Sequence, residues 1–256
     1  MMKRVGQWMA GGAALLFACV AYAYLTLPDV RPLAKVNPSS TAFSDLRARE
    51  AEEAGKPAKH VQRWIGYRRI SPTLTRAVLV AEDAAFWQHD GVDYDELQKS
   101  IELDWARGQL MRGASTITQQ LAKNLYLSPS KNPLRKFREL LIARRLEGDL
   151  TKTRILELYL NLIEWGDGIY GIEAASQAYF HKSAASLAPS EAALLAGAII
   201  NPRVLNPNKP TQRLLRRQQI ILRRMGGVTP PAAPAPSAAD DDAAGEAARL
   251  FLRGSA

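Results

Sequence analysis

The stretch that decides the fold is PSEAALLAGAII, residues 189–200. A proline–serine–glutamate start is followed by residues that are apolar almost all the way round a helix, from Ala192 to Ile200, and Asn201–Pro202 ends the run. A helix that is apolar on every side is buried in a protein core or in lipid, and crossing a membrane takes about 20 residues. Because this segment is too short to cross, it predicts the central helix of a folded domain.

Other helices are indicated on both sides of that segment. Ser71 followed by Pro72 is a typical helix start, a second helix begins near Pro133, and Thr151 is placed to cap a third. The stretch 211–225 alternates arginine clusters with Leu and Ile at helical spacing. No convincing run of alternating apolar and polar residues occurs, so the predicted fold is mostly α-helical with little sheet.

Composition restricts the partners and the chemistry. The 256 residues carry a formal net charge of +9, which indicates an anionic partner: nucleic acid, phospholipid or a phosphorylated substrate. The single cysteine, Cys19, excludes an intrachain disulfide framework, and the three histidines are scattered without the spacing of zinc ligands.

The ends of the chain differ from its middle. We predict four parts: a cytoplasmic N-terminus with a membrane anchor (1–28), a polar irregular stalk (29–60), a catalytic domain (61–226) and a Pro/Ala-rich disordered tail (227–256). No charge interrupts the segment between Arg4 and Asp29, so it predicts one transmembrane helix. A cleaved signal peptide would be shorter, and the basic residues before the segment place the domain after it outside the membrane.

Glu82 is the first candidate for chemistry. Leu74, Val78 and Glu82 are spaced by four, so the carboxylate lies on the face of a helix that also carries apolar residues. A carboxylate on such a face costs free energy unless it is paired or functional. A buried salt bridge with an arginine is one interpretation; a general base whose pKa is raised by burial is the other.

The segment RGASTITQQLAKN, residues 112–124, is the second candidate. A glycine turn leads hydroxyl and amide side chains into a helix start, where free backbone N–H groups suit an anionic or sugar ligand. Gln119, Gln120 and Lys123 share one side of that helix. A polar capped helix without a ligand would have the same pattern.

A cationic cluster follows, formed by Lys131, Arg135, Lys136 and Arg138 around Glu139. Several cations beside one acid suit a diphosphate, although a solvated basic face is the common alternative. Ser128–Lys131 also matches the S-x-x-K pattern of penicillin-binding transpeptidases, but no K-T-G follows, so we interpret that match as coincidence.

These residues resemble glycosyltransferase family 51. EDAAFWQHDG (82–91) is similar to the family's E-D-x-x-F-x-x-H-x-G motif, and GASTITQQ (113–120) with Lys123–Asn124 resembles its second motif. Arg135 to Glu139 with Lys152 and 155–161, then 171–180 and 191–197, resemble the others. With no transpeptidase domain following, the resemblance is to the monofunctional biosynthetic transglycosylase branch, and it implies a lysozyme-like helical fold of two lobes.

The resemblance also implies a reaction. The growing glycan, held by its lipid diphosphate, is the donor, and Glu82 deprotonates the 4-hydroxyl of lipid II, which attacks the anomeric carbon with inversion to give a β-1,4 bond. Glu139 is the second catalytic acid. The substrate-binding residues are implied to be Asp83, Phe86, His89, Gly113, Ser115, Thr116, Gln119, Gln120, Lys123, Asn124, Lys131, Arg135, Lys136 and Arg138. Lys131 stands where close relatives carry an arginine, so it keeps the charge but loses the bidentate fork.

The expected surroundings follow from the same resemblance. The partners are lipid II, the growing strand, the inner membrane and cell-wall synthesis or division proteins, and not nucleic acid. A divalent cation, Mg²⁺ or Mn²⁺, is left open at the diphosphate. We also expect the segment from Val92 to Leu110, with Trp105, to dip into the bilayer surface, because its apolar residues have near-helical spacing.

Two other functions fit parts of the sequence. A lysozyme-like enzyme that cleaves glycan would also use a glutamate in a cleft, but it needs no diphosphate site. A non-catalytic cell-wall scaffold would tolerate loss of the acids, whereas Glu82 and Glu139 are both present.

Overall fold

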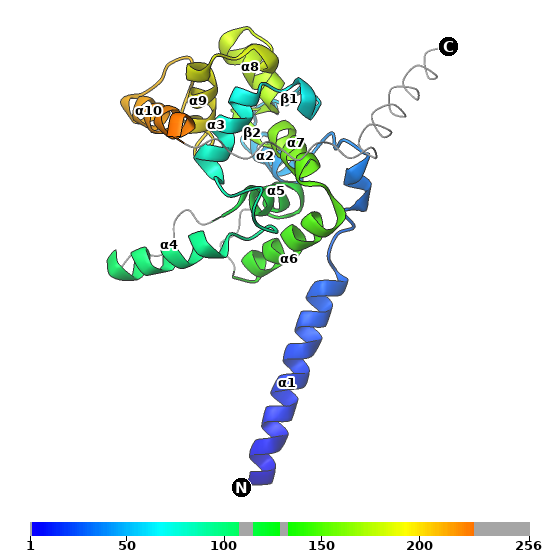
Figure 1. The fold of residues 1–256 in the computed structure, drawn as a ribbon. Helices are drawn as coiled ribbons and strands as arrows, with labels where there is room; N and C mark the ends of the chain where they lie inside the picture. The colour runs from blue at the N-terminus through cyan, green and yellow to red at the C-terminus, as the bar shows by residue number, and fades with distance from the viewer. Residues whose placement is uncertain (1, 108–114, 129–132, 228–256) are drawn as a thin grey trace.

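The structure is a computed structural model that describes residues 2–107, 115–128 and 133–227. It confirms a mostly helical fold (Figure 1). The α-helices are α1 (Met2–Leu25), α2 (Ala42–Glu53), α3 (Pro72–Glu82), α4 (Tyr94–Arg107), α5 (Ile117–Tyr126), α6 (Pro133–Asp149), α7 (Lys152–Leu162), α8 (Ile172–Phe180), α9 (Pro189–Ala198) and α10 (Gln212–Gly227). Three 3₁₀ turns are η1 (Arg31–Ala34), η2 (Tyr67–Arg69) and η3 (Ala184–Ser186).

The sheet is small, as predicted. Its strands are β1 (Val61–Gln62), β2 (Glu164–Gly166) and β3 (Ile169–Tyr170), in the order β1–β3–β2. β1 pairs with β3 in parallel, with Val61 opposite Ile169, and β2 pairs with β3 antiparallel across an irregularity between Glu164 and Gly166. The sheet joins the start of the globular body to the chain between α7 and α8.

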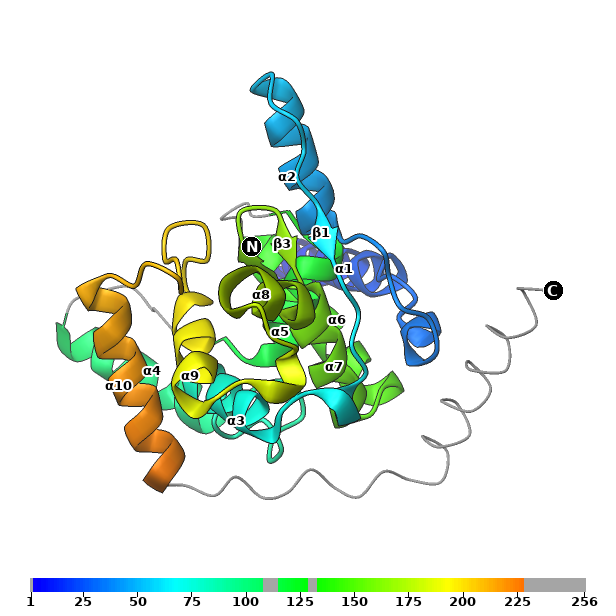
Figure 2. The same cartoon turned by 90° about the horizontal axis from the view of Figure 1, so that it is seen from above.

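Helix α9 has the central place that its apolar sequence predicts. It packs between α3 and α10 (Figure 2), and Ala192, Ala193, Leu195 and Ala196 have no exposed surface. The small residues let the neighbouring helices approach closely: a Cβ added at Gly197 would stand 3.1 Å from Leu214 Cδ1 of α10. The end of the apolar run is different, because α9 ends at Ala198 and Ile200 is half exposed.

A second layer consists of α5, α6 and α7. Leu121 on α5, Ile142 and Leu146 on α6, and Ile155 and Leu158 on α7 are fully buried in one core. Thr151 caps α7 as predicted, since its hydroxyl accepts a hydrogen bond from Arg154 N–H at 3.1 Å. At the start of α3 the prediction is half right: Pro72 is the first helical residue, but the Ser71 side chain makes no capping bond.

The N-terminal helix α1 projects away from the body (Figure 1). Its aromatic side chains Trp8, Phe17, Tyr22 and Tyr24 are exposed. Within residues 2–107, 115–128 and 133–227, no helix combines the length and the hydropathy needed to cross a membrane.

The first half of the predicted stalk is packed against the body and is not free. Leu27, Val30 and Leu33 are buried in the main core, and α2 packs on α5. Thr41 and Ser44 form a reciprocal cap at the start of α2. The polar segment with prolines predicts a stalk, because its few apolar residues have no helical or strand period. In the structure Val30 and Leu33 are nevertheless buried, whereas Val36 is 58% exposed. The boundaries of the four predicted parts stay a prediction.

Arginines hold this segment by its backbone carbonyls. Arg138 on α6 donates to the Thr26 carbonyl at 3.1 Å, and Arg145 donates to the Leu27 and Pro28 carbonyls at 3.4 Å. Arg154 on α7 reaches the Leu33 carbonyl at 2.7 Å and the Val36 carbonyl at 2.9 Å. A buried or half-buried loop must satisfy its carbonyl groups, and these guanidinium groups do so.

Helix α4 extends from the same side of the body as α1 (Figure 1). Tyr94 and Ile101 on it are exposed, whereas Val92 just before it is buried. The Trp105 side chain, Leu110, Gly113, Lys131 and the predicted tail from residue 228 lie outside what the structure describes.

Candidate functional site

Glu82 is the last residue of α3, and its side chain is only 13% exposed. Its Oε2 accepts a hydrogen bond from Gln120 Nε2 on α5 at 3.0 Å. Its Oε1 faces Arg217 Nη2 on α10 at 4.0 Å, which is too long for a direct ion-pair hydrogen bond. Burial raises the pKa of Glu82, while Gln120, Arg217 and Lys123 act in the opposite direction. The largely buried carboxylate thus has one amide hydrogen bond and one arginine at the outer limit of an ion pair, so its environment is compatible with both interpretations of the sequence, the arginine pair and the general base.

Asp83, the next residue, joins the end of α3 to the start of α5. Its Oδ2 accepts the Ile117 backbone N–H at 2.9 Å, and its Oδ1 is 2.9 Å from His89 Nε2. Gly91 N–H donates to His89 Nδ1 at 3.2 Å, so Nδ1 is the acceptor and Nε2 carries the proton that binds Asp83. Asp83 thus places a negative charge at the amino end of α5, where the helix dipole favours it.

The first motif therefore contributes mainly to positioning. Phe86 has no exposed surface and packs under Lys152 Nζ, which lies 4.5 Å from the ring centroid. The side chains of Asp83 and His89 are 2% and 8% exposed. Phe86 and His89 support the site from behind, whereas Asp83 both holds α5 and takes part in lining the cavity described below. The substrate-binding role that the resemblance implies for these residues stays a prediction.

Gly91 ends the motif in a conformation that other residues rarely adopt, with φ +82°. A Cβ there would meet Glu147 Cγ at 3.0 Å. The Gly91 carbonyl accepts a hydrogen bond from Thr116 Oγ1 at 2.7 Å, which ties this turn to the amino end of α5 as well.

The start of α5 is a capped helix, as the sequence allowed. Thr116 Oγ1 accepts the Gln119 N–H at 3.2 Å, and Gln119 Oε1 accepts the Thr116 N–H at 3.4 Å. Other polar groups near the amino end of α5 do not take part in capping. Ser115 Oγ accepts a hydrogen bond from Lys136 Nζ at 3.0 Å, and Asn124 donates back to the Gln120 carbonyl at 2.8 Å.

Three cations gather beside α5. Arg135 Nη1 lies 2.6 Å from Glu139 Oε2, and Lys136 Nζ lies 2.5 Å from Glu139 Oε1, while the Glu139 side chain is 4% exposed. Lys123 interacts electrostatically with both Glu139 and Glu82, and burial lowers its pKa. Of the sequence-predicted cluster, the structure brings Arg135 and Lys136 together on Glu139, which is ion-paired through both oxygens. It holds the cations in place and offers no free carboxylate for proton transfer.

Arg138 does not belong to this cluster. It follows Lys136 by two residues, and a step of two on a helix points to the opposite side. Its guanidinium binds the hydroxyl and carbonyl of Thr26 at 3.1 Å. The prediction that Arg138 contacts substrate is not supported by this position, and Gly113 and Lys131 are outside the described residues.

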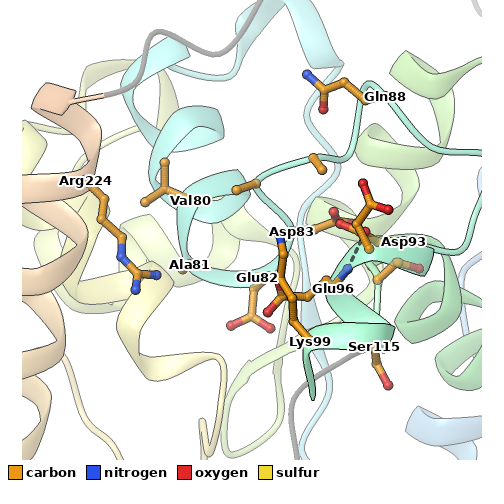
Figure 3. A pocket seen from close by; sticks show the side chains of 14 residues that line it. Val80, Ala81, Glu82, Asp83, Gln88, Asp93, Glu96, Lys99, Ser115 and Arg224 are labelled. Atoms are coloured by element: carbon orange, nitrogen blue, oxygen red, sulfur yellow. Dashed lines mark hydrogen bonds between the residues drawn. The ribbon is translucent and has the colours of Figure 1, made fainter. Parts of the chain in front are cut away.

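Glu82 takes part in lining a cavity of about 550 Å³ (Figure 3). Carboxylates from the start of α4 and Arg224 from α10 face it. Its lining comprises Val80, Ala81, Glu82, Asp83, Ala84, Ala85, Gln88, Asp93, Asp95, Glu96, Lys99, Ser115, Thr116 and Arg224. The cavity and the cation cluster meet at Ser115, which lines the cavity and accepts a hydrogen bond from Lys136.

The described residues do not form a metal centre. Across residues 2–107, 115–128 and 133–227, no group of three or more His, Cys, Asp or Glu side chains is placed to hold a metal ion. Since both Glu139 oxygens are paired with cations, that carboxylate does not fit a protein-bound Mg²⁺ or Mn²⁺.

Sequence reasoning missed two groups at Glu82. Arg217 comes from α10, where Arg217 Nε also donates to the Gly197 carbonyl at 3.1 Å. Tyr159 on α7 donates to Gln120 Oε1 at 3.0 Å. The arginine clusters of 211–225 and the apolar face of 155–162 were visible in the sequence, but nothing in them indicated which member would point to Glu82.

A largely buried carboxylate beside clustered cations suits an enzyme of the transferase class, in which a hydroxyl is deprotonated next to an anionic leaving group. The model of the transglycosylase family matches residues 47–226. The chain belongs to this family. Curated relatives named biosynthetic peptidoglycan transglycosylase include one from Dechloromonas aromatica, 46% identical over 71% of this chain and 78% of its own length. Another, from Laribacter hongkongensis, is 41% identical over 82% of this chain and 92% of its own length.

Proposed function

We propose that the protein polymerises the glycan strands of peptidoglycan in cell-wall synthesis. The observation that carries the proposal is the position of Glu82, a largely buried carboxylate that lines a cavity and interacts electrostatically with Lys123, beside Arg135 and Lys136. Membership of the transglycosylase family and relatives named biosynthetic peptidoglycan transglycosylase support the same activity.

The proposed chemistry assigns one substrate to the cations and the other to the cavity. The diphosphate of the lipid-linked growing strand lies against the three cations, and the acceptor sugar of lipid II occupies the cavity. Glu82 takes the proton of the acceptor 4-hydroxyl, the oxygen forms a bond to the donor's anomeric carbon, and the bond from that carbon to the diphosphate breaks. The cations stabilise the charge that develops on the leaving diphosphate. Attack opposite the leaving group inverts the α-linkage to a β-1,4 bond.

The residues of the first two motifs prepare this geometry. Asp83 and His89 fix α5 against α3, and Gln119, Gln120, Ser115 and Asn124 complete the donor side. A divalent cation stays part of the proposal only as one that arrives with the diphosphate, because the Glu139 carboxylate is already paired with Arg135 and Lys136.

The setting of the proposed reaction is the outer face of the inner membrane. A 24-residue helix extends about 36 Å at 1.5 Å per residue, longer than a hydrocarbon core of about 30 Å, and α1 has that length. We propose it as a single-pass anchor with a cytoplasmic N-terminus. Lipid II and the growing strand lie in the same membrane. We therefore propose that α4, like α1, faces that membrane.

We also propose the finer architecture that the resemblance implies. The larger, lysozyme-like lobe would contain α3 and α8 to α10, and the smaller lobe near the membrane would contain α4 and the start of α6. The four parts 1–28, 29–60, 61–226 and 227–256 stay as proposed, with cell-wall synthesis or division proteins as candidate partners.

The test is incubation of the purified full-length protein in detergent with labelled lipid II, with products resolved by gel. A ladder of glycans that grows with time and is absent for Glu82→Gln is expected. No ladder from a protein that binds lipid II would contradict the polymerase and favour a scaffold. Shortening of a pre-formed glycan would instead assign the chain to glycan cleavage.

A further inference from the structure

A buried hydrogen-bonded chain leads from α7 to the carboxylate of Glu82. Tyr159 has no exposed surface, and its hydroxyl donates to Gln120 Oε1 at 3.0 Å. The same amide donates from Nε2 to Glu82 Oε2 at 3.0 Å. We propose that Tyr159 is a positioning residue for glycan polymerisation, because its hydroxyl holds the Gln120 amide with Nε2 toward Glu82. The inference rests on the proposed role of Glu82 as the base.

The surrounding acceptors determine which end of the amide faces Glu82. An ionised carboxylate only accepts hydrogen bonds, and the Ser115 carbonyl, 3.5 Å from the same Nε2, is also an acceptor. The end that faces both must therefore be the NH₂ group, which leaves Oε1 on the side of α7. Among the described residues, Tyr159 is the donor that this oxygen meets.

Tyr159 is suited to remain a donor through the reaction. Burial raises its pKa well above the usual value of 10.0, and the charges of Glu82 and Asp83 act in the same direction. Its ring is fixed among the fully buried side chains of α7, including Ile155 and Leu158, so the hydroxyl has little freedom to move.

Loss of the hydroxyl has a defined consequence for Glu82. Without it, Gln120 Oε1 faces a buried apolar wall, and an unpaired buried amide oxygen is costly, so the side chain turns away. Glu82 then loses the hydrogen bond that favours its ionised form, and its pKa rises further. Other charges face Glu82 from α3, α4, α5 and α10 and are unchanged by the substitution: Asp83, Glu96, Lys99, Lys123, Arg217 and Arg224.

The experiment is the pH profile of kcat/KM for lipid II polymerisation, which reports groups of the free enzyme. Activity needs ionised Glu82, so it rises with pH through the pKa of that group. For Tyr159→Phe we expect this acid limb to move to higher pH, with kcat/KM roughly tenfold below wild type under the original midpoint and near wild type on the plateau. A uniform loss at every pH, or no change, would overturn the proposal.

Tyr170→Phe is the matched control. Tyr170 is also a buried tyrosine, 2% exposed, but its hydroxyl meets no hydrogen-bond partner among the described residues. Its removal should leave the acid limb in place. If Tyr170→Phe moved the limb as far as Tyr159→Phe does, the effect would come from loss of any buried hydroxyl and the proposal would fail.

Two further variants test the route and the underlying function. Gln120→Met keeps the length of the side chain without its hydrogen bonds, and it should move the limb as Tyr159→Phe does. Adding Tyr159→Phe to it should then have no further effect on the limb, because the two residues act in one chain; an additive shift would contradict the route through Gln120. Glu82→Gln is measured alongside. If this variant polymerises, the assignment of Glu82 as the base is wrong. If it is inactive and the acid limb of Tyr159→Phe has not moved, only the inference about Tyr159 is rejected.

Discussion

Glu82 and Glu139 are two buried glutamates of one site with opposite surroundings. Glu139 has a cation on each oxygen, at 2.6 Å from Arg135 and 2.5 Å from Lys136. Glu82 has one neutral amide at 3.0 Å and an arginine held back at 4.0 Å. A fully paired carboxylate is a poor base and a good brace for cations, whereas one that burial has left short of partners gains affinity for a proton. The charged partners of each carboxylate, and not its degree of burial, separate the proposed base Glu82 from Glu139, which holds cations.

The largest expected effect that tests this contrast is that of Glu82→Gln. The amide keeps the shape but cannot take a proton, so polymerisation should fall by roughly 10²–10⁴-fold while lipid II binding persists. Activity is measured by the glycan ladder and binding by retention of labelled lipid II; turnover near wild type would contradict the base assignment.

The stability of the same variant gives an independent check. Because burial raises the folded-state pKa of Glu82, its ionisation opposes folding, and wild-type stability falls as pH rises through that pKa. Glu82→Gln has no such loss, so it should unfold at a higher temperature than wild type at pH 7 and no longer do so at acid pH.

Lys123→Ala removes a cation that lies between the two glutamates. The donor diphosphate should lose about 1.5–3 kcal/mol of binding free energy, the range for a charged hydrogen bond. The measurement is the affinity for the lipid-diphosphate donor, with exposed Lys209→Ala as the control for a change of net charge. Equal affinities for both variants would show that Lys123 does not bind the donor.

Glu139→Gln should have the opposite effect on stability from Glu82→Gln. Arg135 and Lys136 lose a buried counter-charge, so the free energy of unfolding should fall by roughly 1–3 kcal/mol, measured by urea denaturation. The control is Asp167→Asn, which also removes a carboxylate with two cationic partners, Lys59 and Arg203, but at 52% side-chain exposure. Exposed pairs contribute about 0–1 kcal/mol, so equal losses would mean that burial does not matter here.

Arg217→Gln is expected to have the smallest effect. The guanidinium favours ionised Glu82 from 4.0 Å, so its loss should move the acid limb of kcat/KM to higher pH and lower activity there roughly two- to fivefold. Arg216→Gln removes the same charge from an exposed neighbour on α10 and should leave the limb unmoved. If the acid limb of the pH profile stays in place for both variants, Arg217 does not influence Glu82, and its role is the hydrogen bond to the Gly197 carbonyl.

Local sequence patterns predicted the parts of the fold that depend on neighbouring residues. The apolar run of α9, the cap at Thr151 and the shared side of Gln120 and Lys123 all follow from helical spacing. The contacts that shape the site join residues far apart in the chain, such as Glu82 with Arg217 and Gln120 with Tyr159. No periodicity encodes those pairs, because they depend on how α3, α5, α7 and α10 pack together.

The same limit applies to residues whose implied contact with substrate stays a prediction. Asp83 and His89 belong to a motif whose resemblance suggests contact with substrate, but their side chains face Ile117 and each other. Arg138 belongs to a run of cations, yet the rotation of the helix sends it to the Thr26 carbonyl. In each case the sequence indicated the type of chemistry, but it did not predict the direction in which the side chain points.

The bond from Asp83 to the first amide of α5 has a mechanical consequence. Glu82 is covalently next to Asp83, and Gln120 and Lys123 lie on α5, the helix that Asp83 holds. The proposed base and the donor-side groups are therefore linked through one residue. A substrate cannot be admitted by prising α3 and α5 apart without breaking a buried charged hydrogen bond. If the proposed reaction opens the cleft, we therefore expect the hinge to lie outside this connection, so that Glu82 keeps its spacing to Gln120 and Lys123 at each addition.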